Sequence, residues 1–185
     1  DGILALGWSI EWLAENNFIK INANDFLADL DDEVYRLCVH TTTAQKLNID
    51  WFDIVFYLRK RLNTKNTPLP FYKKICLAEC LRLVIDNICL AIIADDKTMY
   101  NGNAIAKGLL LLSTLKDVKV DTDNTTKQAL EKYTLAIMQK MDLAQVVPND
   151  IIIAKAITTV AKRLNNKHLK TMANKLTRSL KKEDT

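Results

Sequence analysis

Apolar side chains recur every three or four residues through each long segment of this chain, and that spacing constrains the fold more than any other feature. Phe26, Leu30 and Val34 form one such series, and Ile54 and Leu58 belong to another. A period close to 3.6 residues puts apolar side chains on one face of an α-helix. The 185 residues include four Gly and three Pro, too few for the turns of an all-β fold. We therefore predict an all-α protein with about eight helices in an irregular bundle or a short stack of helical hairpins.

Capping residues and breaks in the apolar pattern set the expected helix ends. Asn22 or Asn24 can cap the second helix, because an Asn side chain accepts hydrogen bonds from the first free backbone N–H groups. The segments in which we expect helices are residues 3–16, 25–38, 51–62, 71–94, 104–115 and 125–141, followed by two helices within 153–182. Segment 71–94 is apolar around most of its circumference, which predicts a central, mostly buried helix.

Pro68 and Pro70 mark the clearest break in the helical pattern, because proline cannot continue a helix. We place there the boundary between an acidic N-terminal helical lobe, residues 1–66, and a larger C-terminal helical lobe, residues 67–185. One continuous domain is the alternative. The chain begins with Asp1 rather than Met, which suggests an excised fragment or a processed chain.

Charge is unevenly distributed along the chain. Residues 1–57 contain three Lys or Arg against ten Asp or Glu, a net charge of −7. Residues 151–185 contain nine Lys or Arg against two Asp or Glu, a net charge of +7. This polarity predicts an acidic partner for the C-terminal end, or attraction between the two ends.

The four cysteines, Cys38, Cys76, Cys80 and Cys89, lie within apolar helical patterns. A disulfide framework would usually lie in loops, and a zinc site would use CxxC pairs or His at ligand spacing. We expect buried free thiols, no metal and no cofactor, which favours an intracellular, reducing compartment. The sequon at Asn124 would be an N-glycosylation site in a secreted protein. We expect no membrane-spanning segment, because charged residues interrupt the longest apolar stretches.

The last thirty residues are the strongest candidate for a binding surface. Two amphipathic helices meet at Asn165-Asn166, and both carry Lys or Arg opposite an apolar stripe. The residues that we assign to a partner-binding surface are Lys155, Lys162, Arg163, Lys167, Lys170 and Arg178. Concentrated charge of one sign suits an acidic motif or a phosphate group. An ordinary solvated helix face is the alternative.

Part of this C-terminal region resembles a known docking domain. Residues 153–157 read Ile-Ala-Lys-Ala-Ile, and residues 166–176 read Asn-Lys-His-Leu-Lys-Thr-Met-Ala-Asn-Lys-Leu. Together with Lys162-Arg163, this run resembles the N-terminal domain of the elongation factor TFIIS, also called the LW domain. The resemblance extends over residues 130–182. It implies a non-enzymatic module that binds short linear motifs of transcription partners in the nucleus.

Three positions depart from the pattern of that family. Ala154 replaces the family Gly, Leu180 stands where a Trp is expected, and Ile151 replaces a Thr. Much of what remains is the pattern that any amphipathic helical hairpin would use.

The tryptophans Trp8, Trp12 and Trp51 lie in the acidic part of the chain. Trp8 and Trp12 are four residues apart, so they share one side of a helix. Core packing is the expected role, because Trp is mostly buried on average. The alternative is an exposed anchor for a partner helix.

We predict a non-enzymatic protein–protein interaction module that docks a linear motif or a partner helix, in nuclear transcription if the resemblance holds. The partner would be an acidic or amphipathic protein segment. The alternative is nucleic-acid binding through the basic C-terminal face. The sequence contains no Gly-rich phosphate loop, GxSxG elbow or HExxH motif. Cys38 and His40 are two residues apart on a predicted helix and would point to different sides, so no catalytic residue is assigned.

Overall fold

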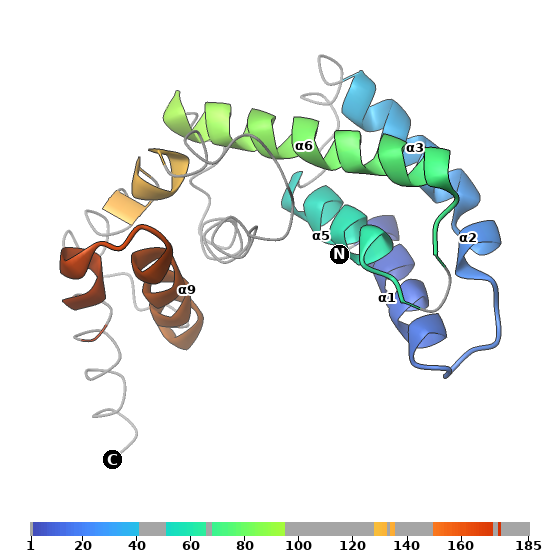
Figure 1. Ribbon diagram of the computed structural model, residues 1–185, viewed down its shortest axis with the longest axis horizontal. Coiled ribbons are helices and arrows are strands. Elements are labelled where there is room, and N and C mark those ends of the chain that lie inside the picture. The colour runs from blue at the N-terminus through green and yellow to red at the C-terminus, as the bar shows by residue number, and fades with distance from the viewer. Residues whose placement is uncertain are drawn as a thin grey trace. The chain divides into compact units, whose positions relative to one another are not determined.

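The computed structural model describes residues 2–40, 51–65, 68–94, 128–132, 134–135, 150–171 and 174 (Figure 1). Within these ranges the chain forms helices joined by short turns and contains no strand, which confirms the all-α prediction. The chain divides into two compact units, Asp1–Asn87 and Ile88–Thr185. This division falls inside a long helix, whereas the sequence suggested a boundary at residue 66.

The first unit contains most of the described helices. In chain order they are α1 (Ile3–Glu15), α2 (Ala23–Phe26), α3 (Ala28–Val39), α5 (Trp51–Leu62) and the larger part of α6 (Phe71–Ile93). The observed ends of α1, α5 and α6 agree with the predicted ones to within one residue. The helix expected from residue 25 is instead divided at Leu27 into α2 and α3. Asn22 caps α2, since its Oδ1 accepts a hydrogen bond of 3.1 Å from the backbone N–H of Asn24.

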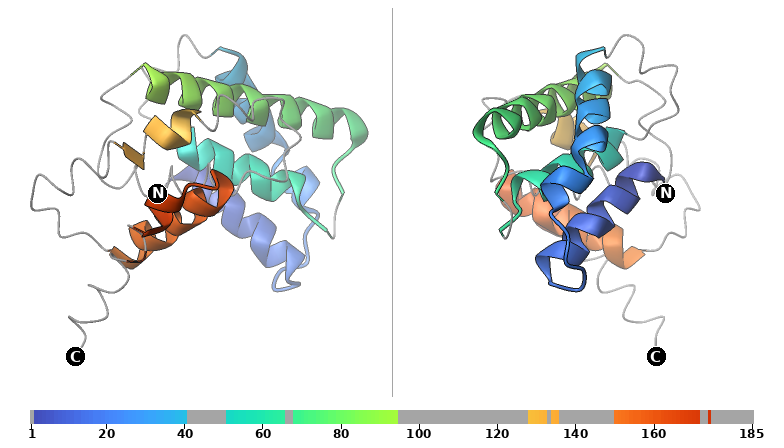
Figure 2. Two further views of the ribbon diagram at one scale, coloured as in Figure 1. Left: turned by 60° about the vertical axis from the view of Figure 1, so that its left-hand side comes forward. Right: turned by 90° about the vertical axis from the view of Figure 1, so that its right-hand side faces the viewer.

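Helix α1 lies along α5 (Figures 1 and 2), and a glycine allows close packing. A Cβ atom added to Gly7 would lie 2.5 Å from Cδ2 of Leu30 on α3 and 2.7 Å from Cε2 of Tyr57 on α5. The buried residues of α1 are therefore Leu4, Gly7 and Glu11. The core-packing role expected for Trp8 and Trp12 is wrong, because this close contact turns a different side of the helix inward.

The end of α1 is closed by a Schellman motif. Asn17 adopts a left-handed conformation with a φ of 60°, and its N–H donates to the carbonyl oxygen of Ala14 at 3.1 Å. The N–H of Phe18 donates to the carbonyl oxygen of Leu13 at 2.9 Å. These two bonds satisfy free carbonyls at the helix end and turn Phe18 back onto Trp12. The two rings stack with centroids 5.5 Å apart and planes inclined by 22°.

Helix α6 is buried along one side. Its buried residues are Leu77, Cys80, Leu81, Val84, Ile85, Ile88, Cys89 and Ile92. Ile75 and Leu90 are exposed, as are Phe71 and Tyr72 in the first turn. The prediction of a mostly buried helix is therefore too broad, because apolar residues also occupy the solvent side of α6.

The second unit contains the end of α6, the helical residues 128–132 and 134–135, α9 (Asp150–Arg163), and the helical residues 167–171 and 174. Lys132 donates from Nζ to the carbonyl oxygen of Ile93 at 2.6 Å. This bond satisfies a carbonyl at the C-terminal end of α6, where a cation is also favoured by the helix dipole. Among the side chains that the structure describes in α9 and the segment after it, Ala156, Ile157, Val160, Ala161 and Leu169 are buried.

The break predicted at Asn165-Asn166 is present and has a clear cause. Asn165 adopts a left-handed conformation with a φ of 50°, which ends α9. Asn166 then caps the next helix, because its Oδ1 accepts from the backbone N–H groups of His168 at 3.0 Å and Leu169 at 3.2 Å. Two adjacent Asn residues thus end one helix and begin the other.

Several predictions lie outside the described residues, namely the helix at 104–115, the sequon at Asn124 and the binding residue Arg178. None of the helices that the structure describes is long and apolar enough to cross a membrane.

Candidate functional site

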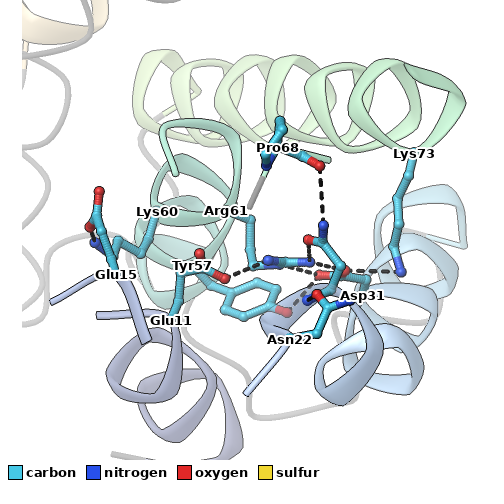
Figure 3. A network of polar contacts seen from close by, with 10 residues as sticks. Glu11, Glu15, Asn22, Asp31, Tyr57, Lys60, Arg61, Pro68 and Lys73 are labelled. Carbon is cyan, nitrogen blue, oxygen red and sulfur yellow. Dashed lines mark hydrogen bonds and ion pairs between the residues drawn. The ribbon is translucent and has the colours of Figure 1, made fainter. Parts of the chain in front are cut away.

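A fully buried arginine lies at the centre of the first unit (Figure 3). Arg61 projects from α5 between Glu11 of α1 and Asp31 of α3, and all three residues have no exposed surface. Arg61 donates from Nε to Asp31 Oδ1 at 3.0 Å and from Nη2 to Asp31 Oδ2 at 2.8 Å. Its Nη1 forms an ion pair with Glu11 Oε2. Bidentate Arg–carboxylate pairing is among the strongest hydrogen-bonding arrangements in proteins.

Further donors surround the Asp31 carboxylate. Tyr57 donates from its hydroxyl to Asp31 Oδ1 at 2.6 Å, and Lys73 of α6 places its Nζ 3.0 Å from Asp31 Oδ2. Asn24 accepts from Arg61 Nη2 and donates to the carbonyl oxygen of Pro68, each at 3.1 Å. These contacts join α1, α2, α3, α5, α6 and the Pro68 segment into one network. They also explain why the first part of α6 belongs to the same compact unit as the residues before Pro68.

The network keeps its members in defined charge states. Burial by itself raises the pKa of Asp31, but the hydrogen bonds from Arg61 and Tyr57 outweigh it and hold that pKa below its usual value. Burial raises the pKa of Tyr57, and the hydrogen bond to Asp31 raises it further, so the phenol stays neutral and donates. Burial alone would lower the pKa of Arg61, but the hydrogen bond to Asp31 raises it. At neutral pH, Asp31 is therefore an ionised acceptor and Arg61 a cation.

The chemical role that follows for this network is structural. Asp31 is already occupied by three donor residues, so it is not available as a base. Glu11 uses Oε2 for Arg61, whereas its Oε1 is buried and has no hydrogen-bond partner in the described part of the chain. A buried charge is expensive unless paired, so this arrangement selects one relative position of α1, α3 and α5.

An aromatic surface flanks the buried face of α1 that carries Leu4, Gly7 and Glu11. It consists of Trp8, Trp12 and Phe18, whose exposed fractions are 39%, 40% and 67%. Lys60 of α5 places its Nζ 5.8 Å from the centroid of the Trp8 ring and forms an ion pair with Glu15. A lysine at this distance is attracted to the face of an indole ring. The next residue of α5, Arg61, points inward, so α5 contributes to both the core and the aromatic surface.

The basic residues selected from the sequence fall into three groups. Lys162, Lys167 and Lys170 are exposed on the two sides of the Asn165-Asn166 turn. Arg163 is partly buried and takes part in an interaction. Lys155 lies in α9, where its side chain is outside the described set, as is all of Arg178.

The cysteines are free thiols, as predicted, but they are not all buried. Cys38, Cys80 and Cys89 are buried, whereas Cys76 is exposed on α6. A hydrogen bond with Cys80, together with burial, raises the pKa of Cys38. Among the described residues, no three His, Cys, Asp or Glu side chains lie together in a group that could hold a metal ion.

The sequence reasoning missed Glu11, Asp31 and Arg61 as a unit. Asp31 lies in the first turn of α3 and Arg61 in the last turn of α5, where the helix dipole also favours these charges. One signal was present in the sequence, because Leu4, Gly7 and Glu11 are spaced by three and four residues. A carboxylate in an otherwise small and apolar series indicates a buried acid that needs a partner.

Comparisons of this chain with protein-family models, with curated proteins and with solved structures found no match. The resemblance of residues 130–182 to the TFIIS N-terminal domain therefore stays a prediction.

Proposed function

We propose that this chain is a non-enzymatic helical interaction module that docks a linear motif or a partner helix on the aromatic surface of its first unit. The observation that carries the proposal is the exposure of Trp8, Trp12 and Phe18 as one connected group. Trp and Phe are enriched in protein interfaces, and Trp is among the commonest residues that dominate binding energy.

The size of the exposed rings supports this proposal. About two-fifths of the surface of each tryptophan residue is open to solvent, so a partner could cover on the order of 100 Å² per tryptophan. At about 25 cal/mol per Å², this area is worth about 2.5 kcal/mol per ring before ordering costs are subtracted.

The rigidity of the scaffold reduces those ordering costs. Glu11 connects α1 to the buried Arg61, and Phe18 is held against Trp12 by the turn at Asn17. Groups that are already ordered in the free protein lose little conformational entropy on binding. The aromatic surface is therefore suited to binding without rearrangement of the helix that carries it.

A second candidate is an acidic or nucleic-acid partner of the basic C-terminal face. The exposure of Lys162, Lys167 and Lys170 favours it. The protein would act in the nucleus if the resemblance of residues 130–182 to the TFIIS domain holds. Phosphate binding weakens steeply as salt concentration rises, whereas docking on aromatic rings keeps its apolar contribution at high salt even when flanking charges are screened. Binding measured across a salt series separates the two candidates.

The proposal is tested by quantitative capture of proteins from a cell extract with matched variants. The test variant is Trp8→Ala/Trp12→Ala, and the control is Phe71→Ala/Tyr72→Ala, which removes another pair of exposed aromatic rings from the same unit. We expect at least one partner to be retained by the parent and the control and lost by the test variant. Circular dichroism checks that both variants remain helical. Equal capture by all three proteins, or loss with the control alone, would contradict the proposed site.

A further inference from the structure

We infer that the aromatic surface selects an amphipathic helix whose apolar side chains are flanked by carboxylates. This inference rests on the proposed interaction function and adds the chemistry of the partner. Its basis is the combination of ring spacing along α1 with the charges that surround the rings.

The spacing of the rings matches one face of a helix. Trp8 and Trp12 are one helical turn apart on α1, and Phe18 extends the row beyond the end of that helix. Side chains one turn apart on a helix are separated by about 5–6 Å. A partner helix with apolar residues at positions i, i+3, i+4 and i+7 presents the same spacing and can pack along this row.

The charges around the rings are mainly positive. Lys60 lies over the Trp8 ring, Lys65 acts on Glu15, and the exposed Lys20 follows Phe18 by two residues. Glu15 is the carboxylate of this group, and the hydrogen bond from Lys60 lowers its pKa, with Lys65 adding to the effect. Lys60 and Lys65 thus accompany one carboxylate that is already paired, and Lys20 adds a further positive charge nearby in the chain. This excess favours carboxylates on the partner.

The carboxylates of α3 lie in a different part of the first unit from Lys60 and Glu15. Figure 3 shows Lys60 and Glu15 on the opposite side of Arg61 from Asp31 and Lys73. The exposed carboxylates that neighbour Asp31 along α3 are Asp29, Asp32 and Glu33. Salt at physiological concentration screens exposed charges beyond about 8 Å. Lys60, whose Nζ lies 5.8 Å from the centroid of the Trp8 ring, is within that distance of a helix bound on the ring.

The buried network adds no net charge to this surface. It contains two carboxylates, Glu11 and Asp31, and two cations, Arg61 and Lys73. Its charges are also bonded to one another. The charges that the structure relates directly to the aromatic surface are consequently those of Lys60, Lys65 and Glu15, and Lys20 follows Phe18 in the chain.

The inference is tested with three fluorescently labelled synthetic helical peptides and the whole chain. The first peptide has Leu at i, i+3, i+4 and i+7 and Glu at the flanking positions, the second has Lys in place of Glu, and the third has the composition of the first in scrambled order. Fluorescence anisotropy gives each Kd. We expect the Glu peptide to bind about tenfold more tightly than the Lys peptide at low salt, and the two to converge at about 1 M salt.

A charge variant identifies the source of this preference. Lys20→Glu/Lys65→Glu replaces two exposed lysines, one that follows Phe18 by two residues and one that acts on Glu15, and Lys74→Glu replaces an exposed lysine of α6 as the matched control. We expect the double variant to lose the preference for the Glu peptide and the control to keep it. Trp8→Ala/Trp12→Ala should weaken binding of both charged peptides.

The outcomes separate the inference from the proposed function. Equal or tighter binding of the Lys peptide overturns the charge inference, and if that binding still depends on Trp8 and Trp12, the interaction function stands. Equal binding of the scrambled peptide, or no binding of any peptide, overturns the helical partner. If the extract capture then also shows no dependence on Trp8 and Trp12, the proposed function fails as well. Binding to phosphatidylserine vesicles that requires both tryptophans, without peptide binding, would assign the surface to lipid and overturn the inference.

Discussion

The first unit and the segment from α9 to residue 171 use positive charge in opposite ways. In the first unit, Arg61 is completely buried between Glu11 and Asp31. In the second segment, Lys162, Lys167 and Lys170 are exposed, while Ile157, Val160 and Leu169 are buried. The second arrangement is the ordinary amphipathic helix. The first places ions where an amphipathic pattern would place apolar residues.

This difference shows what a charged residue can contribute in each environment. A lysine in water interacts weakly with its neighbours, and many changes are tolerated there. A buried arginine must be matched by acceptors in defined positions, because an unpaired buried charge is strongly unfavourable. The network around Arg61 therefore favours one packing of several helices. The exposed lysines place no such constraint on how the helices pack.

Replacement of the buried arginine should have the largest effect on stability. Arg61→Met would leave Glu11 and Asp31 buried without their shared cation, and we expect the free energy of unfolding to fall by about 3–5 kcal/mol. The matched control is Arg36→Met, which breaks an exposed ion pair with Glu33 and should cost about 0–1 kcal/mol. Urea unfolding followed by circular dichroism measures both. A similar decrease in the free energy of unfolding in both variants would show that the buried ion pairs contribute no more to stability than the exposed one.

Acid should weaken the same network without a mutation. The pKa of Asp31 is lower in the folded protein than its usual value, so ionised Asp31 stabilises the fold above the unfolded pKa of about 3.9. This contribution is lost as the pH falls from there through the folded pKa. We expect urea midpoints to decrease below about pH 4. Asp31→Asn should be less stable at pH 7 but should lose less stability on acidification, and an unchanged pH profile in that variant would argue against this role.

The close contact at Gly7 should produce an intermediate effect. The Cβ of Gly7→Ala would meet the ring of Tyr57, which is held by its hydrogen bond to Asp31. Overpacking costs about 1–3 kcal/mol, and the better helix propensity of Ala offsets about 1 kcal/mol of that cost, so we expect a net loss of about 0–2 kcal/mol. Ser9→Ala, a small change at another position of α1, should stay within about 0.5 kcal/mol. Thermal unfolding of both variants measures the difference, and a stabilised Gly7→Ala would show that α1 does not need this approach.

Charge reversal on the C-terminal segment should have the smallest effect on stability. The test variant changes four residues to Glu, namely Lys162, Arg163, Lys167 and Lys170. We expect the free energy of unfolding to shift by about 0.5 kcal/mol or less per position. Binding to an acidic partner of this face should slow, most visibly in the association rate at low salt. If the variant folds and binds as the parent does, the basic face is an ordinary solvated surface. If it unfolds, these side chains are structural, and the contrast with Arg61 disappears.

Helix positions could be predicted from the sequence because they depend on local features. The apolar period located α1, α5 and α6, and Asn residues marked the start of α2 and the turn at 165–166. The division between α2 and α3 was missed, since one turn at Leu27 leaves the apolar period almost unchanged. The exposure of Trp8 and Trp12 was also missed, because either side of an apolar helix such as α1 can face the core.

The amino-acid sequence by itself determined the all-α class, the ends of α1, α5 and α6, and the concentration of basic residues near the C-terminus, since each follows from local spacing, capping or composition. The tertiary structure alone decided that Glu11, Asp31 and Arg61 would meet inside the first unit and that Trp8 and Trp12 would remain outside it. The physical reason is that burial and ion pairing depend on which helices approach one another. Residues separated by 20 to 50 positions become neighbours only when the fold has brought their helices together.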